Sequence, residues 1–550
     1  MNNFIEKIKE IISNAIELIY PNNEILNFIV EKTKSINFGN YSSNVAMVLA
    51  KSLKDSPMNI GESIIAAIDN DLFKKIEIIK PGFINFHFSN KVYEEIINVI
   101  NNTKENYGQY PKNGKFVNIE YVSANPTGSL HLGHARNAAV GSSLGYALEK
   151  YGYKVDYEYY VNDAGNQINI LGVSVLTRYF ELFGKKIKLD ESFYNGPEPK
   201  IVAKYLKKYY GDRFLNEKIE GPIIHNEEAR NIINNFSKYF LLEIIKSTLE
   251  KFNCKFNIYY QETNVYRENL IPVFLKKMID NIYLMDNAIW LNTTINGDDK
   301  DRVLVKSDGN MTYLTPDIVY HAIKLSRRNY EIIFDILGAD HGSYLKRMQA
   351  AITSAGFKST LNVITLQMIK LTKNGETFKM SKRTGVGITM LDLIEAIGVD
   401  AARWYLLAQD ANSHLEIDIE QCTKKDNSNQ LYYVLYSYAR ISNIIEKIGN
   451  DLIPKINFSF LTIQKEKEIV DHLSFFPILV KNVAETYELQ KICTYLNELA
   501  NLFNSYYANV KIIDSSNLDI QNNRLNLITA VKWTIFSGLG ILGIEPKKKI

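Results

Sequence analysis

The chain has 550 residues and a net charge of only +3, from 64 basic and 61 acidic side chains. Its composition, 46% hydrophobic and 23% charged, is that of globular proteins, and its length is enough for about three domains of ~100–200 residues. The balanced charge neither favours nor excludes a nucleic-acid partner. The three cysteines are far apart, which argues against a disulfide framework or a zinc site. Glu6, Glu10 and Glu17 interrupt the apolar residues of the first segment, and no run of about 18 apolar residues occurs. We therefore expect a cytoplasmic protein without a membrane partner.

The N-terminal region has the pattern of a small α+β domain, which we place at residues 1–112. Apolar residues recur at helical spacing over 4–19, and Pro21 then ends the predicted helix. Residues 76–88 predict a hairpin, because an apolar run is followed by Pro-Gly and a second strand-like run. A turn-rich linker at 107–114 follows.

The central region, residues 113–420, begins with a strand pattern at 116–122, a loop at 123–130 and a helix pattern at 131–150. Strand, Gly/Pro loop and helix open a nucleotide-binding α/β unit. Further strand-like runs alternate with helices, at 154–160, 302–306, 332–337 and 361–366. They predict an α/β fold with a doubly wound, Rossmann-type, largely parallel sheet. The polar, Lys- and Tyr-rich residues 183–260 predict a helical insertion, and residues 421–550 predict an all-α helix bundle.

The first motif whose residues could take part in a reaction is His131-Leu-Gly-His134, at the predicted first turn of the helix. A spacing of three places both imidazoles on one helix face, about 4.5 Å apart along the axis. A helix N-terminus attracts phosphate, and Gly133 leaves room for a nucleotide near the backbone. The alternatives are two incidental histidines or half of a metal site. We predict no metal site, because no third or fourth ligand is evident nearby.

A second motif, Lys379-Met-Ser-Lys382, lies roughly 250 residues later and is followed by Arg383. Three cations within five residues, flanked by glycines, make a basic loop that can close over pyrophosphate and neutralise its charge. The ordinary alternative for such a run is a solvated surface loop. The two motifs in one chain, in this order, are much more specific than either alone.

Together the two motifs resemble the paired signatures of class I aminoacyl-tRNA synthetases, and further segments resemble the arginyl-tRNA synthetase family. In the central region these segments are residues 123–128, 158–167, 301–309, 313–317, 338–341 and 399–403. Residues 38–41 and 81–85 are similar to the extra N-terminal domain of that family, and residues 432–440 to its anticodon-binding bundle. The resemblance implies an arginine–tRNA ligase that activates L-arginine with ATP and transfers it to tRNA(Arg).

The resemblance also implies an arginine site. Asn125 is expected at the α-amino group, and Glu262 and Asp317 at the guanidinium, which favours carboxylates in bidentate contact. Further arginine contacts implied by the family are Tyr313, as a wall of the pocket, and Asp340 and His341. Without the family resemblance, the alternative for each acid is a surface or capping residue, and Pro316-Asp317 has the pattern of a turn.

By the same resemblance His131, His134, Lys379 and Lys382 are the catalytic residues, acting on ATP by charge stabilisation. The remaining predicted ATP contacts are Gly133, Gln367, Met368 and Ser381; for the Gln367–Met368 pair, ordinary strand packing stays an equal alternative. Mg²⁺ is expected with ATP, held largely by its phosphates. No side chain is required as a covalent nucleophile, because the arginine carboxylate attacks in line.

Contacts with tRNA are predicted at Tyr433, Tyr436 and Arg440, which share one helix face and can stack on unpaired bases. The alternative is a core stripe, which is the commoner fate of aromatic residues at that spacing. The family resemblance further implies a monomer, with an N-terminal domain that touches the tRNA elbow.

The sequence departs from the family pattern at several positions, none of which removes a predicted catalytic group: Ser129, Pro316, Gln430 and Ile550. Three other functions are alternatives to an arginine–tRNA ligase. A class I synthetase for another amino acid lacks the arginine-type motifs. A non-catalytic tRNA-binding paralogue is expected to have damaged signatures, and a metabolic nucleotidylyltransferase to lack the flanking domains. Whether activation of arginine needs bound tRNA is left open by the intact Lys-Met-Ser-Lys motif.

Overall fold

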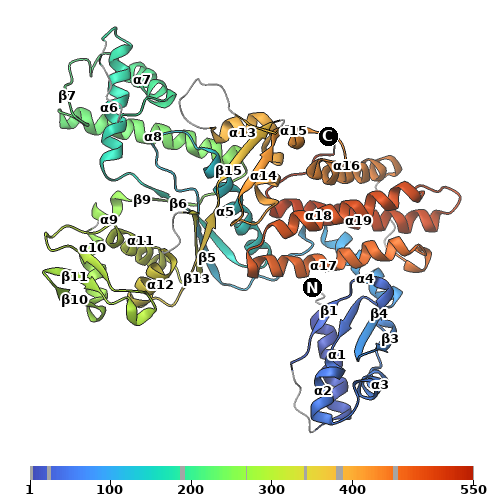
Figure 1. Cartoon of the computed structure of the whole chain (residues 1–550). Coiled ribbons are helices and arrows are strands. Elements are labelled where there is room, and N and C mark those ends of the chain that lie inside the picture. The colour runs from blue at the N-terminus through green and yellow to red at the C-terminus, as the bar shows by residue number, and fades with distance from the viewer. Residues whose placement is uncertain are drawn as a thin grey trace.

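The computed structural model describes residues 4–21, 27–185, 187, 193–267, 269–339, 344–373, 375–378, 388–449 and 456–548. Figure 1 shows an elongated C-terminal bundle (orange to red) with the N-terminal region (blue) against its side. The central α/β region lies at the end of the bundle that α5 and α14 approach, and two smaller lobes project from it, one containing α6–α8 and the other α9–α12.

The N-terminal region folds around an antiparallel sheet of order β1-β2-β4-β3. Its elements are α1 (Phe4–Ile19), β1 (Val30–Lys32), β2 (Tyr41–Ser43), α2 (Val45–Leu53), α3 (Pro57–Ala67), β3 (Phe73–Ile79), β4 (Phe83–Phe88) and α4 (Asn90–Thr103). Helix α1 buries Phe4, Ile8 and Ile12, the apolar positions that predicted it. Strands β3 and β4 pair antiparallel as a hairpin. The predicted helix and hairpin are therefore confirmed.

The central region is built on a five-stranded sheet in which every neighbouring pair is parallel, in the order β14-β13-β5-β6-β9. These strands are β5 (Phe116–Glu120), β6 (Lys154–Val161), β9 (Ile258–Gln261), β13 (Tyr330–Gly338) and β14 (Thr360–Leu366). The chain runs outward from β5 through β6 to β9 and then returns to the other side with β13. The strand order therefore reverses between β5 and β13, the position where doubly wound sheets bind ligands beyond their carboxyl ends. This confirms the predicted Rossmann-type fold.

Helix α5 (Leu132–Lys150) connects β5 to β6 and packs unusually close to the sheet. A Cβ atom at Gly141 would stand 2.4 Å from the ring of Tyr121, and one at Gly145 would stand 2.2 Å from the ring of Tyr157. Because real side chains do not tolerate such distances, these glycines set the separation between α5 and the strand ends that carry the candidate site.

Two details of the central region differ from the prediction. The run predicted at 302–306 is β12 (Arg302–Val305), which belongs to a separate antiparallel sheet of order β10-β11-β12, so its place in the parallel sheet was wrong. The insertion predicted to reach residue 260 ends earlier, because β9 is a strand of the main sheet. For β12, the sequence of a short strand does not show which strand it pairs with. For β9, the half-buried tyrosines gave no clear strand pattern. The elements around β12 are α9 (Thr263–Arg267), α10 (Leu270–Lys277), β10 (Ile282–Met285), β11 (Ala288–Leu291), α11 (Leu314–Arg327) and α12 (Tyr344–Ser354).

The helical insertion has its own hydrophobic core, separate from that of the sheet, with Leu171, Leu206 and Ile233 at its centre. It contains α6 (Asn166–Glu181), α7 (Pro197–Tyr210), β7 (Ile219–Glu220), β8 (Ile223–Ile224) and α8 (Glu227–Lys251). The predicted helical character is confirmed, and α6, which precedes the predicted start, packs with α7 and α8 as part of the same lobe.

After β14 a small sheet precedes the bundle. Its region contains β15 (Ile369–Lys373), β16 (Glu376–Thr377), α13 (Met390–Ile397), α14 (Val399–Leu407), β17 (Leu415–Asp418) and α15 (Ile419–Thr423). The bundle consists of α16 (Gln430–Ile448), α17 (Gln464–Thr486), α18 (Gln490–Asn509) and α19 (Leu518–Ile541), as predicted. In the part of the chain that the structure describes, no helix has the length and apolar character needed to span a membrane.

The three regions are joined by specific polar contacts as well as by apolar packing. Asp471 of α17 accepts hydrogen bonds from Asn40 (2.9 Å) and pairs with Lys32 (2.8 Å), both from the N-terminal region. Arg403 of α14 is fully buried and donates to the carbonyl oxygens of Phe252 and Leu542. These contacts give the N-terminal and central regions defined positions relative to the bundle.

Candidate active site

The His-Leu-Gly-His motif forms the N-terminus of α5, where the two histidines cap the helix and each other. The backbone N–H of Gly133 donates to Nδ1 of His131 (3.0 Å), and the backbone N–H of His131 donates to Nδ1 of His134 (3.2 Å). The two rings stack with centroids 3.6 Å apart. A Cβ atom at Gly133 would stand 3.0 Å from the His131 ring, so a larger residue at this position would press on the ring and require it to shift.

The hydrogen bonds of this cap determine which ring nitrogen carries the proton. Both Nδ1 atoms accept, so each neutral ring carries its proton on Nε2, which stays available as a donor. Burial lowers the pKa of His131, and burial together with the charge of His131 lowers the pKa of His134 to about 4. Two neutral donors at a helix N-terminus are suited to the oxygens of a phosphate.

The loop between β5 and α5 is strained where it leaves the sheet. Val122 and Ser123 have φ values of +66° and +40°, which β-branched valine in particular rarely adopts. Ser123 Oγ donates to Glu120 (3.1 Å) and accepts from the backbone N–H of Tyr160 (3.0 Å), so the hydroxyl ties the loop to both strands. Further along, Asn125 Nδ2 donates to Gln167 Oε1 (2.7 Å).

The predicted acids Glu262, between β9 and α9, and Asp317, in the first turn of α11, lie close enough for the charge of Asp317 to act on Glu262. Burial raises the pKa of Glu262, and the charges of Asp163 and Asp317 raise it further. The phenol of Tyr160 is near both acids: burial raises its pKa, as do the charges of Glu262 and Asp317. A site with two acids and an aromatic wall suits a delocalised cation. Tyr160 lies within the family-like segment 158–167, but its position near the two acids was not predicted.

Tyr313 departs from this arrangement. Its side chain is 99% exposed at the N-terminus of α11, so the structure does not bring it against Asp317 or Glu262. Its role as a wall of an arginine pocket therefore stays a prediction. Five further predicted residues lie outside the described residues: Asp340, His341, Lys379, Ser381 and Lys382.

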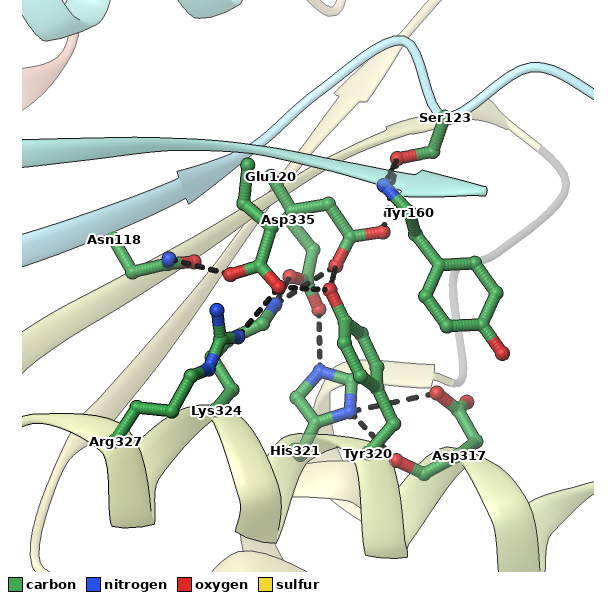
Figure 2. A network of polar contacts seen from close by, with 11 residues as sticks. Asn118, Glu120, Ser123, Tyr160, Asp317, Tyr320, His321, Lys324, Arg327 and Asp335 are labelled. Carbon is green, nitrogen blue, oxygen red and sulfur yellow. Dashed lines mark hydrogen bonds and ion pairs between the residues drawn. The ribbon is translucent and has the colours of Figure 1, made fainter. Parts of the chain in front are cut away.

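Behind Asp317 is a buried network of charges that sequence reasoning did not find (Figure 2). Helix α11 contributes His321, Lys324 and Arg327, and the strands contribute acids that pair with them. Lys324 Nζ is fully buried, 2.8 Å from Glu120 and 3.3 Å from Asp335. The only signal in the sequence is the spacing of three between the basic residues, because the acids come from β5, β6 and β13.

Asp163 is a second buried acid, and it fixes the backbone beside Glu262. Its carboxylate accepts from the backbone N–H and the hydroxyl of Thr263, both at 3.0 Å, and pairs with buried Lys238 at 3.0 Å. Because Thr263 follows Glu262 directly, this contact sets the start of α9 and hence the position of the candidate acid. Asp163 lies within the family-like segment 158–167, but its role was not predicted.

The segment that follows the Lys-Met-Ser-Lys motif contacts the His-Leu-Gly-His segment. The backbone N–H of Met390 donates to the carbonyl of Leu130 (2.7 Å), and the N–H of Leu132 donates to the carbonyl of Ile388 (3.2 Å). A capping box then starts α13: Thr389 Oγ1 accepts from the backbone N–H of Asp392, whose carboxylate accepts from that of Thr389. The described residues that follow the basic segment, Ile388 to Met390, therefore lie beside the start of α5, the helix that the histidine pair caps.

Gln367 is held by Arg136, which lies on α5 two residues after His134, and the carbonyl of the adjacent Met368 accepts from the backbone N–H of Leu415. The buried Arg136 guanidinium donates to the carbonyl oxygens of Gln367 (2.8 Å), Ser413 (2.9 Å) and Asp410 (2.8 Å). Met368 itself is 78% exposed, which favours a contact surface over strand packing for this side chain. Arg136 was missed, because nothing in the local sequence indicates carbonyl partners more than 200 residues away.

The predicted tRNA-contacting residues lie on α16 but do not form one uniform face. Tyr436 is exposed, and Arg440 donates to its hydroxyl (2.8 Å) and lies over its ring, 4.4 Å from the centroid. Arg440 also donates to Asn504 of α18 (3.1 Å). Tyr433 is half-buried and lines a cavity of about 360 Å³ with residues of α18. Among the described residues, no group of three or more His, Cys, Asp or Glu is placed to hold a metal ion.

The parallel sheet, the histidine-capped helix at its switch point and the helical bundle are the features of class I aminoacyl-tRNA synthetases. Residues 95–429 match the family model described as tRNA synthetases class I (R), catalytic domain. Residues 6–88 match the arginyl tRNA synthetase N terminal domain, and residues 434–550 match the DALR anticodon binding domain. The chain therefore belongs to the arginyl-tRNA synthetase family.

Individual relatives agree with this assignment. The chain is 46% identical to an arginine–tRNA ligase of Malacoplasma penetrans over 99% of this chain and 98% of that protein, and 38% identical to one of Bacillus subtilis over the full length of both. A structure described as a putative arginyl tRNA synthetase from Campylobacter jejuni is 34% identical, with a TM-score of 0.76 over 84% of this chain and all of that chain. The Thermus thermophilus arginyl-tRNA synthetase, 17% identical, has the same fold with a TM-score of 0.76 over 99% of this chain and all of that chain.

Proposed function

We propose that this chain is an arginine–tRNA ligase. In the first step a carboxylate oxygen of L-arginine attacks the α-phosphorus of ATP, and pyrophosphate leaves with the electrons of the broken P–O bond. In the second step a terminal ribose hydroxyl of tRNA(Arg) attacks the carbonyl of arginyl-adenylate, AMP leaves, and the hydroxyl proton is released. The observation that carries the proposal is the electrostatic coupling of Glu262 with Asp317 beside Tyr160, within a class I synthetase fold.

The arginine site in this proposal uses charge complementarity. Glu262 and Asp317 receive the guanidinium, with the Tyr160 ring as a wall, and Asn125 receives the α-amino group. A neutral analogue such as citrulline would leave the two acids without a cation, which costs several kcal/mol for buried charges. Tyr313, Asp340 and His341 complete the proposed contacts.

The ATP site in this proposal uses the N-terminus of α5. The Nε2 donors of His131 and His134 bind phosphate oxygens, and Gly133 leaves room beside them. Lys379, Ser381 and Lys382 bind the pyrophosphate as charge develops on it, and Gln367 and Met368 border the adenine. Mg²⁺, carried in by ATP, would supply further neutralisation of the phosphate charge.

The flanking regions are proposed as tRNA-binding domains of a cytoplasmic monomer. We place the boundaries at residues 1–112, 113–420 and 421–550, so that each family match falls largely within one unit. Exposed Tyr436, with Arg440 over its ring, supports stacking on an unpaired base. The cavity beside Tyr433 supports a second contact for a base on the same helix.

The proposal is tested by amino-acid-dependent exchange of pyrophosphate into ATP. Each of the twenty amino acids is supplied singly, with and without bulk tRNA. Exchange with arginine alone is expected, and its dependence on tRNA shows whether activation needs the second substrate. Exchange with a different amino acid would overturn the specificity and keep the class. No exchange from folded protein under either condition would overturn the ligase assignment in favour of a tRNA-binding protein.

A further inference from the structure

His321, on the buried face of α11, lies between two carboxylates of different character. Its Nε2 is 2.9 Å from Asp335 Oδ2, and its Nδ1 is 2.9 Å from the carbonyl oxygen and 3.4 Å from the carboxylate of Asp317 (Figure 2). The Asp335 carboxylate is buried in the sheet, whereas 35% of the Asp317 side chain is exposed on the side of the candidate site. His321 therefore joins an internal acid to the acid that we assign to the guanidinium.

The partners of His321 define its charge. A neutral imidazole has one donor and one acceptor, but both ring nitrogens here face oxygen atoms that only accept. Both nitrogens must therefore carry protons, and the ring is a cation. Burial alone lowers the pKa of His321, but the charge of Asp335 and the hydrogen bonds to both aspartates outweigh burial and raise it to about 10. The opposing effect of nearby Lys324 does not cancel this rise.

Among the described residues, the elements packed against His321 supply the charged groups that face it. Strand β13 provides Asp335, α11 provides Asp317 and Lys324, and Tyr344 of α12 stands at a ring distance of 6.4 Å. Tyr344 is itself coupled to Asp317, because burial and then the Asp317 charge raise the pKa of its phenol. Lys324 is engaged by Glu120 and Asp335, so among these groups His321 is the cation that contacts Asp317.

The imidazolium of His321 places a positive charge beside one of two neighbouring acids. Glu262 and Asp317 are like charges in a partly buried position, and such pairs favour taking up a proton on one member. A protonated acid would present a neutral group to an incoming cation. A fixed positive charge behind Asp317 offsets part of the repulsion between the two acids and holds the Asp317 carboxylate in one orientation.

We propose that His321 is a positioning residue for substrate specificity: as an imidazolium anchored by Asp335, it holds the Asp317 carboxylate in the orientation that receives a guanidinium group. The inference rests on the proposed function, because it assumes that Asp317 faces arginine. The competing explanation is that His321 only fastens α11 to β13 and affects stability alone.

Two substitutions separate these explanations, because each keeps one of the two contacts. The amide nitrogen of Asn stands where Nδ1 does, so His321→Asn keeps a donor toward Asp317. The amide nitrogen of Gln stands where Nε2 does, so His321→Gln keeps a donor toward Asp335. Both remove the charge. The matched control is His472→Gln, at a buried histidine that stacks on Tyr495 in the bundle, far along the chain from this site.

The measurement is equilibrium binding of arginine and citrulline by titration calorimetry, which does not depend on catalysis. We expect His321→Gln to weaken arginine binding about tenfold or more, the scale of one charge-assisted hydrogen bond, and His321→Asn to weaken it less. Both variants should narrow the preference for arginine over citrulline, with ATP affinity unchanged, and His472→Gln should change none of these. Unchanged arginine affinity and selectivity in folded His321 variants would overturn the inference. Failure of the wild-type protein to bind arginine would instead overturn the proposed function.

A second measurement uses the wild-type protein and covers the case in which the His321 variants do not fold. In protein with ¹⁵N-labelled histidine rings, His321 is expected to stay doubly protonated at about pH 8, where ordinary histidines of pKa near 6.5 are neutral. Addition of arginine should shift its Nδ1 signal. If all eight histidines are neutral at that pH, the proposal is overturned.

Discussion

The backbone N–H of Met390 donates to the carbonyl of Leu130 over 2.7 Å, although 260 residues separate them in the chain. This bond and its neighbour between Leu132 and Ile388 place the exit of the Lys-Met-Ser-Lys segment at the start of the histidine-capped helix. Ile388, the first described residue after the motif, therefore lies beside the histidine pair that we propose to bind phosphate.

Loss of the Thr389 cap should lower the catalytic rate more than the small loss of folding stability would explain. Thr389→Ala removes the hydroxyl that accepts from Asp392 and should destabilise the protein by about 1 kcal/mol. Because Thr389 stands at the loop exit, we expect a several-fold fall in kcat for pyrophosphate exchange with a small change in the KM for arginine. Ser56→Ala removes an equivalent cap from α3 and is the control. Equal kcat in the two variants would contradict the anchoring role.

Asp317→Asn should affect arginine selectively. The amide keeps the size of the side chain but removes the charge that we assign to the guanidinium, so the KM for arginine should rise about tenfold or more while that for ATP changes little. Pyrophosphate exchange at varied arginine and ATP measures both. Asp308→Asn, in an exposed turn, is the matched control. A parallel rise in both KM values would remove Asp317 from the guanidinium site.

Asp163→Asn should damage both stability and arginine binding, through separable routes. The variant leaves Lys238 buried without its anion, which typically costs about 3–5 kcal/mol. The double variant Asp163→Asn/Lys238→Met removes the unpaired charge and should recover much of the free energy of unfolding in urea. It should not recover the KM for arginine, because the carboxylate contact that sets Glu262 through Thr263 is still absent. Recovery of both quantities together would show that Asp163 acts on stability alone.

Gly543→Ala should loosen the junction between the catalytic region and the bundle. Gly543 has a φ of +67°, and a Cβ atom there would stand 2.5 Å from the buried guanidinium of Arg403. Strained backbone and displaced arginine together should lower the free energy of unfolding by about 2–4 kcal/mol. Gly540→Ala is the control, because no atom lies within 4 Å of a Cβ at that helical position. Equal urea midpoints for the two variants would contradict the predicted clash.

Acid should destabilise the protein through its buried neutral histidines. The pKa of His472 is lowered to about 4, chiefly by burial. Between about pH 6.5 and pH 4 the unfolded chain therefore binds a proton that the folded chain excludes, so the free energy of unfolding falls as the pH falls. His472→Gln should flatten this part of the profile in urea unfolding at a series of pH values. A slope identical to that of the wild-type protein would show that His472 does not contribute.

The candidate site was predicted unevenly, and the reason lies in the kind of signal each residue leaves. The His-Leu-Gly-His motif is a run of four consecutive residues, and in the structure its two histidines cap the N-terminus of α5. Glu262 and Asp317 were predicted from the family, and the rise that the Asp317 charge causes in the pKa of Glu262 agrees with a shared location, although their binding role stays a prediction. Arg136, Asp163 and His321 were not predicted, because what distinguishes each is a partner far away in the chain.

The sequence by itself determined the class of fold, the hairpin, the helix bundle and the two motifs, because periodicity, turn residues and contiguous signatures are local properties. Only the tertiary structure decided that β9 belongs to the main sheet and β12 does not, since strand pairing is a relation between segments. It also decided the charge state of His321, because a proton on a buried imidazole depends on the acceptors around it. Asp335 and Asp317 become those acceptors only when β13 and α11 pack together.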